Sequence, residues 1–194
     1  MKSVSTAKFR AAMKMLDCGD AAQALKIGKE LLQSRDESHI LAGHLCVGLI
    51  YETGGFDFTP DIETAVYHYR LAAAITPDPI SFCYLARALM KRNEADYLSA
   101  YKYLNFAKEI KETPQVMLGF AQYYRTRPKN SDLASAKKYY LRAALHGRFD
   151  GFFGYASVCR ELKQNFRALF VDCARLLTGP FIALLIGSDA RDRF

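Results

Sequence analysis

The chain has 194 residues, with 27 Lys and Arg against 20 Asp and Glu, so its formal net charge is +7. This length suits one domain with a substantial core and is short for two. The longest apolar stretch, Phe181 to Ile186, is far shorter than the roughly 20 residues that cross a bilayer, and the first residues lack the apolar core of a signal peptide. We therefore expect neither a transmembrane helix nor export.

The five cysteines indicate a protein of the reducing cytoplasm. They are odd in number and contain no CxxC pair, and their spacing is irregular. Thiols in such a pattern usually pack as small apolar groups, so we expect a cytoplasmic protein without structural disulfides. They are Cys18, Cys46, Cys83, Cys159 and Cys173.

The charge is unevenly distributed. Residues 1–97 hold 11 Lys and Arg against 12 Asp and Glu, whereas residues 98–194 hold 16 against 8. One interpretation is that the basic half meets an acidic protein surface, a phosphate-bearing ligand or anionic lipid. The other is a solvated basic face that keeps the protein soluble.

The first elements in chain order are two helices over residues 5–17 and 20–34. Asp20, with Gln23 three residues later, resembles a capping box at the start of the second helix. Because this pair matches the later segments only weakly, we interpret it as an N-terminal capping hairpin.

The middle of the chain contains an internal repeat. Three segments that begin at Ala65, Ala100 and Ala136 recur at intervals of 35 and 36 residues. Each has two small residues seven positions apart, and between them, four after the first, Tyr69, Leu104 or Tyr140. Residues at this spacing share one helix face, where small side chains allow close approach of another helix. The pattern therefore predicts three packed helices.

Each of these helices is preceded by a second predicted helix, marked by an apolar residue followed by a small one. Gly48 and Gly119 occupy the small position in two of them, and close backbone packing best explains glycine there. Each pair then forms an antiparallel hairpin. The markers before the three helices are Val47-Gly48, Leu85-Ala86 and Leu118-Gly119, and a fourth marker, Tyr155-Ala156, follows them.

Helix starts are predicted where a capping residue stands before proline. This occurs at Thr59-Pro60, Asp78-Pro79 and Thr113-Pro114. Further predicted caps are Ser38, Asp96 and Ser131.

The segment from Val47 to Gly54, together with Asp61, Ala65, Tyr69 and Ala72-Ala73, resembles the Sel1-like repeat, a relative of the tetratricopeptide repeat. The resemblance implies an all-α fold, a right-handed α-α superhelix or solenoid of four to five helix-turn-helix repeats in a single domain. The expected divisions are a capping hairpin over residues 1–37, repeats over 38–77, 78–112 and 113–147, and a degenerate repeat with a capping helix over 148–194.

The last predicted element is the apolar run from Pro180 to Gly187. The last element of a solenoid usually presents a polar face to water, so we expect residues 181–186 to fold back over the fourth repeat. The alternative is an exposed interface with a subunit, for example in a homodimer, with another partner or with a membrane.

Motifs for chemistry are lacking in the sequence. His44 and Cys46 lie on different faces of a helix, and no HExxH, CxxC or phosphate-binding glycine motif is found. We therefore expect a protein that is not an enzyme and has no cofactor, metal site or catalytic residue.

The resemblance implies an adaptor that binds a protein or peptide on the concave face of the solenoid. From helical phase we expect Arg87, Tyr123 and Arg160 to face the partner, together with the basic loop residues Arg125, Arg127 and Lys129, whose side chains suit an acidic surface. A solvated loop is the alternative for the last three. A peripheral binder of anionic membranes or nucleic acid remains the second hypothesis, although no residue-by-residue RNA code is present.

Overall fold

The computed structural model describes residues 2–56, 58–128, 131–173 and 176. These residues form helices joined by turns, with one isolated β-bridge between Gly55 and Phe58. The predicted all-α class is confirmed. Within the same described ranges, none of the helices is long and apolar enough to cross a membrane. The chain divides into two compact units, Met1–Ile110 and Lys111–Phe194, called here the N-terminal and the C-terminal unit.

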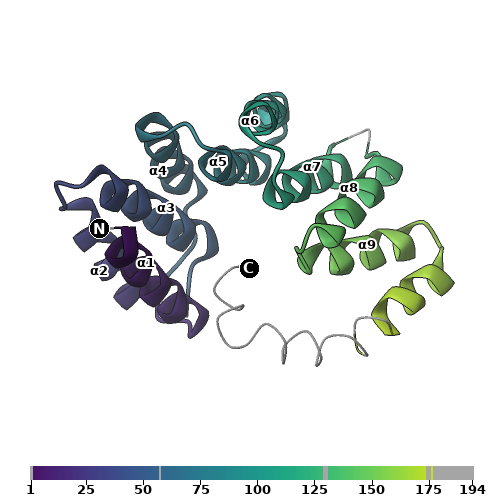
Figure 1. The fold of residues 1–194 in the computed structure, drawn as a ribbon, viewed down its shortest axis with the longest axis horizontal. Helices are drawn as coiled ribbons and strands as arrows, with labels where there is room; N and C mark the ends of the chain where they lie inside the picture. Colours follow the sequence, from purple (N-terminus) through teal and green to yellow (C-terminus); the bar gives the residue numbers. More distant parts are fainter. Residues whose placement is uncertain (1, 57, 129–130, 174–175, 177–194) are drawn as a thin grey trace. The chain divides into compact units, whose positions relative to one another are not determined.

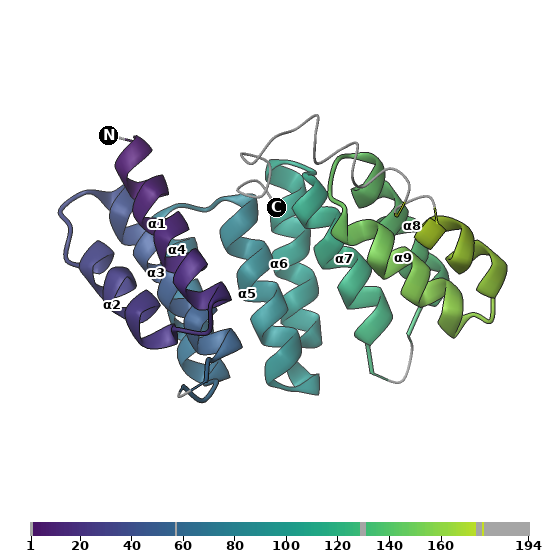
Figure 2. The same ribbon diagram turned by 90° about the horizontal axis from the view of Figure 1, so that it is seen from below.

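Helices that follow one another in the N-terminal unit pack side by side (Figures 1 and 2). The unit begins with the expected pair of helices, and its later helices fall on the predicted repeat segments. Its elements are α1 (Lys2–Asp17), α2 (Ala21–Leu32), α3 (Glu37–Thr53), α4 (Ile62–Ile75), α5 (Pro79–Arg92), the short 3-10 helix η1 (Glu94–Asp96) and α6 (Tyr97–Ile110).

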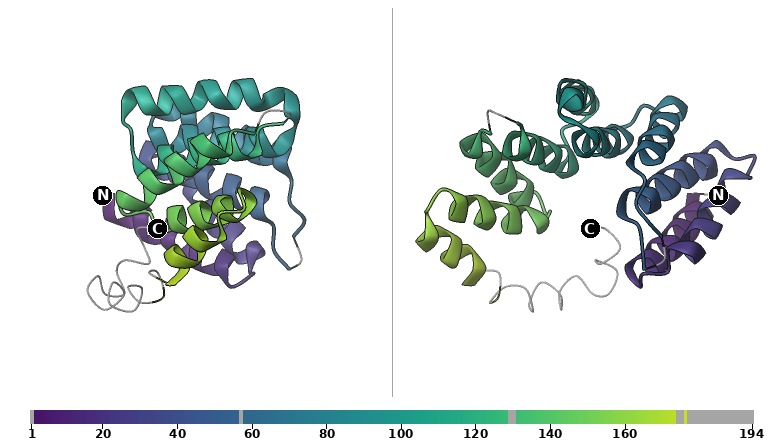
Figure 3. Two further views of the ribbon diagram at one scale, coloured as in Figure 1. Left: turned by 90° about the vertical axis from the view of Figure 1, so that its right-hand side faces the viewer. Right: turned by 180° about the vertical axis from the view of Figure 1, so that it is seen from behind.

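The C-terminal unit contains α7 (Pro114–Thr126), α8 (Leu133–Leu145) and α9 (Asp150–Glu161). Residues 165–173 are also helical and run back beside α9 (Figure 3), where Ala168 packs against Ala156 and Cys159. Lys129 and the apolar run over residues 181–186 lie outside the described residues.

Small residues allow the close helix packing that the repeat pattern predicts. A Cβ atom added to Gly48 of α3 would lie 2.6 Å from Cε1 of Tyr69 on α4, and one added to Gly154 of α9 would lie 2.3 Å from Cδ1 of Tyr140 on α8. Gly119 is buried in α7. The tyrosines of the repeat therefore fill the space that these glycines leave.

Three of the predicted helix starts are confirmed. The carboxylates of Asp20 and Asp78 and the hydroxyl of Thr113 accept hydrogen bonds from backbone N–H groups in the first turns of α2, α5 and α7. These bonds satisfy donors that have no partner inside the helix.

Four other predicted caps are wrong. In three cases a nearby aspartate caps the helix instead, and in the fourth the predicted residue binds an arginine. Asp36 caps α3 in place of Ser38, Asp61 caps α4 in place of Thr59, and Asp132 caps α8 in place of Ser131. The carboxylate of Asp96 binds the Arg92 guanidinium at 2.5 Å and lies at the end of η1.

All five cysteines have free thiols, and Cys46, Cys83 and Cys159 are buried. Burial raises the pKa of the Cys46 thiol to about 12, so this side chain is an uncharged packing group at neutral pH.

Candidate partner-binding surface

Among the described charged groups of the N-terminal unit, Glu52 near the end of α3 is the most buried, with 6% exposure. Arg87 of α5 donates from Nε to one carboxylate oxygen at 2.8 Å and from a terminal nitrogen to the other at 2.5 Å. Lys91 lies 2.7 Å from the first oxygen, and the hydroxyl of Tyr69 donates to the second at 2.8 Å. Three helices are therefore connected through a single carboxylate.

The charges in this cluster are mutually compensated. Burial raises the pKa of Glu52, but hydrogen bonds and charge from Arg87 and Lys91 outweigh it and hold the pKa below its usual value. The Arg87 guanidinium also lies over the ring of Tyr84, 4.7 Å from its centroid. Arg87, predicted as a partner contact, is thus engaged in an internal ion pair.

A related arrangement occurs in the C-terminal unit with the charges reversed. Here the cation, Arg125, lies near the end of α7. It donates to the Ser157 hydroxyl at 2.8 Å and pairs with Glu161, and both partners are on α9. Arg125 also lowers the pKa of Tyr140, which burial raises, and Tyr140 matches Tyr69 in the repeat pattern. Arg125, the second predicted arginine contact, therefore also has internal partners.

Sequence reasoning missed these ion pairs, although a signal for them was present. Arg87 follows Glu52 by 35 residues, and Glu161 follows Arg125 by 36 residues. These separations equal the two repeat intervals. Opposite charges one repeat apart are therefore a pattern that predicts contact between neighbouring hairpins.

The remaining predicted contact residues are dispersed. Tyr123 is buried in α7, with 7% exposure, and the exposed Arg160 pairs with Asp172. Arg127 is exposed at the C-terminal end of α7, where its backbone N–H caps the helix. Among the predicted residues that the structure describes, only Arg127 is exposed and has no carboxylate partner in the described part of the chain.

Basic residues outnumber acidic ones in the C-terminal unit but not in the N-terminal unit. Residues 1–110 hold 13 Lys and Arg against 13 Asp and Glu, whereas residues 111–194 hold 14 against 7. Within the described part of this unit, four carboxylates form ion pairs with arginines and the fifth, Asp132, caps α8. Six basic side chains in the same part have no carboxylate partner: Lys111, Arg127, Lys137, Lys138, Lys163 and Arg167.

Two of these six cations converge on one neutral group. Lys137 of α8 and Arg167 of the helix over residues 165–173 donate to the side-chain oxygen of Gln164, at 3.0 and 3.4 Å. An amide oxygen carries no net charge, so the two positive charges remain uncompensated by any described carboxylate. We call Lys137, Arg167 and Gln164 the cation pair site.

An apolar groove lies directly beside the cation pair site. Its volume is 460 Å³, and α8, α9 and the helix over residues 165–173 all contribute to its lining. Phe166 and Phe170 are 82% and 69% exposed, which is unusual for large aromatic side chains in a water-exposed helix. The residues that line this C-terminal groove are Leu141, Tyr155, Phe166, Arg167, Phe170 and Val171.

Two histidines form a separate contact in the N-terminal unit. Nδ1 of His44 on α3 and Nδ1 of His68 on α4 are 2.9 Å apart, so one ring nitrogen donates to the other. Burial, and then the neighbouring His44, lower the pKa of His68 to about 4. No group of three or more potential metal-ligating side chains occurs among the described residues.

No protein-family model matches the chain. No curated protein matches it in sequence either.

Proposed function

We propose that this protein is a non-catalytic adaptor of the Sel1-like class and that its C-terminal unit binds an acidic protein partner. Helices that pack consecutively, with small residues beneath the repeat tyrosines, support the repeat assignment. A Sel1-like solenoid would bind its partner on the concave face, and we take a cytoplasmic location as part of the same proposal.

The observation that carries this proposal is the charge imbalance of the C-terminal unit. Its described carboxylates are engaged internally, whereas six cations there have no partner among those carboxylates. Unpaired surface cations attract an acidic protein surface and so speed the association of that protein with the C-terminal unit. Because the N-terminal unit has equal numbers of both charges, its matching variants provide an internal control.

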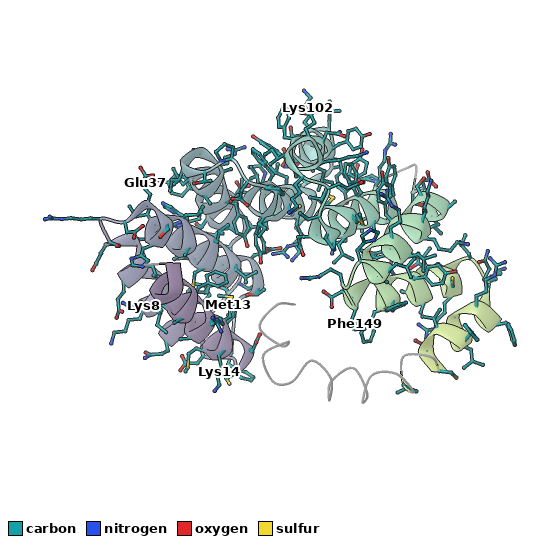
Figure 4. The ribbon with its side chains drawn as sticks, viewed as in Figure 1. Lys8, Met13, Lys14, Glu37, Lys102 and Phe149 are labelled. Carbon is teal, nitrogen blue, oxygen red and sulfur yellow. The ribbon has the colours of Figure 1, made fainter. Side chains whose placement is uncertain are left out.

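Quantitative affinity capture from the native cell extract tests the proposal. The full chain is compared with the double variant Arg127→Glu/Lys138→Glu and with the control Lys26→Glu/Lys102→Glu in the N-terminal unit. All four side chains are exposed, and Lys102 points away from α5 (Figure 4). We expect an acidic protein that the wild type and the control capture equally and the test variant captures at least fivefold less.

The second candidate function, binding of anionic membranes or nucleic acid, is supported by the same basic excess. It predicts binding to generic DNA, RNA or phosphatidylserine vesicles that falls steeply between about 50 and 200 mM salt. Such binding without any captured protein would replace the adaptor proposal.

A further inference from the structure

The cation pair site and the C-terminal groove together form a surface with two adjacent chemistries. Leu141 is four residues after Lys137 on α8, and Arg167 belongs to both features. A ligand that lies along α8 would therefore meet positive charge and apolar side chains within about one helical turn, or roughly 5 Å.

We propose that this surface binds an acidic amphipathic segment of the partner protein, an inference that rests on the proposed function. A carboxylate of the segment occupies the position between Lys137 and Arg167, and an aromatic or aliphatic side chain enters the groove between Leu141 and Phe170. Helix-in-groove recognition of this kind uses apolar anchors on one face of a peptide.

Charge complementarity favours a carboxylate at the cation pair site. Both cations donate to the neutral Gln164 amide oxygen, and a carboxylate would give each of them a charge-assisted hydrogen bond. The groove favours a peptide over nucleic acid, because aliphatic Leu141 and Val171 suit apolar side chains better than a phosphate backbone.

Gln164 allows a sharp test, since Glu at this position would place the missing carboxylate between the two cations. In the variant Gln164→Glu, the new carboxylate should pair with both cations, which stabilises the protein and excludes the carboxylate of the partner. The variant Gln164→Leu removes the amide oxygen but leaves both cations uncompensated. A purely structural role of Gln164 predicts that both variants act alike on binding.

The experiment begins with selection of random 16-residue peptides, displayed on phage, against the full-length wild-type chain. The enriched peptides are then synthesised with a fluorescent label, and their affinities are measured by anisotropy. We expect enrichment of Asp and Glu together with Leu or aromatic residues at helical spacing. Gln164→Glu and Phe170→Ser should each weaken binding at least tenfold, whereas Gln164→Leu should stay within threefold of wild type.

The control for the groove variant is Leu98→Ser, which removes an exposed apolar side chain from α6 of the N-terminal unit and should leave affinity unchanged. The proposal is overturned if selection yields no acidic peptides, or if the selected peptides bind Gln164→Glu or Phe170→Ser as tightly as wild type. Stronger binding to phosphatidylserine vesicles than to any peptide, lost in the same variants, would assign the surface to membranes instead.

The chain's own apolar run over residues 181–186 is another occupant that the experiment separates. If peptides bind only when Leu184→Ser/Leu185→Ser is introduced into the full chain, the groove is taken by its own chain and the proposal fails. The adaptor function has an independent test in Arg127 and Lys138. If capture of the partner from cell extract depends on Arg127 and Lys138 but not on Phe170, the adaptor function stands and only the proposal for the groove is overturned.

Discussion

The Tyr69 hydroxyl donates a 2.8 Å hydrogen bond to the carboxylate of Glu52, and so links α4 to the ion pair between α3 and α5. Tyr140 occupies the corresponding position in the C-terminal unit, where the neighbouring charge that lowers its pKa is the cation Arg125. A tyrosine hydroxyl can donate to a carboxylate or accept from a guanidinium, so the same repeat residue serves both charge arrangements.

Removing the charge of Glu52 tests the strength of the N-terminal cluster. Glu52→Gln leaves Arg87 and Lys91 without a counter-charge, and we expect a loss of about 3 kcal/mol in the free energy of unfolding. Urea denaturation followed by circular dichroism measures it. The control Glu63→Gln removes a solvent-exposed partner of Arg92 and should cost less than about 1 kcal/mol. Equal effects of the two variants would contradict a special role for Glu52.

The Glu52 cluster also predicts how stability changes in acid. The folded-state pKa of Glu52 lies below the usual value of 4.5, so the unfolded chain takes up a proton first as pH falls. The contribution of Glu52 to stability is fully present above pH 4.5 and is lost as pH drops from there through the folded pKa. Subtracting the pH profile of Glu52→Gln from that of wild type should isolate this contribution, which would be flat if the carboxylate were not stabilised by folding.

His68 predicts a decline that begins at higher pH. Its pKa is lowered from 6.5 to about 4 in the folded protein, so protonation favours the unfolded chain as pH falls from 6.5 towards 4. The His68→Gln variant should have a flatter stability profile over this range than wild type, with both measured relative to pH 7.5. NMR titration of the imidazole carbons gives the pKa directly, and a value near 6.5 would contradict the burial of this imidazole.

Close packing at Gly48 predicts an inverted effect of alanine. Alanine usually stabilises a helix relative to glycine, but a Cβ atom here would lie 2.6 Å from the Tyr69 ring. Gly48→Ala should therefore lower the free energy of unfolding by about 1 to 3 kcal/mol. In the double variant with Tyr69→Leu, the added penalty of Gly48→Ala should shrink, which a double-mutant cycle detects.

Lys163 has a backbone conformation that favours glycine. Its φ is 58°, in the left-handed region, just after the end of α9. Lys163→Gly should raise the free energy of unfolding by about 0.5 to 1 kcal/mol, because glycine has no Cβ penalty in this conformation. The substitution Lys138→Gln at another exposed lysine tests loss of charge alone and should change stability by no more than about 0.5 kcal/mol.

The helices could be predicted from the sequence because their signals are local. The spacing of Ala65, Tyr69 and Ala72 identifies one buried helix face, and all three side chains are buried in α4. Neighbouring capping residues compete within a few positions, so Asp61 rather than Thr59 begins the helix. Local patterns therefore predict that a helix is present more accurately than they predict the residue at which it begins.

The candidate surface was harder to predict because it depends on contacts between distant segments. Helical phase placed Arg87 towards a partner, but it carries no information about Glu52 on another helix, which takes up that charge. The cation pair site likewise requires α8 and the turn at Gln164 to come together. Such a site can be predicted only after the packing of neighbouring hairpins is known.

Arg125 was predicted as a partner contact, and exchanging its charge with Glu161 separates that role from folding. Arg125→Glu alone places two carboxylates together and removes the hydrogen bond to Ser157, so we expect a loss of about 1 to 2 kcal/mol. The double variant Arg125→Glu/Glu161→Arg restores an opposite pair and should recover part of that loss. Chemical denaturation of the two single variants and the double variant gives the coupling energy. If that coupling is absent, the contact contributes nothing to stability, and the Arg125 side chain is then available to a partner.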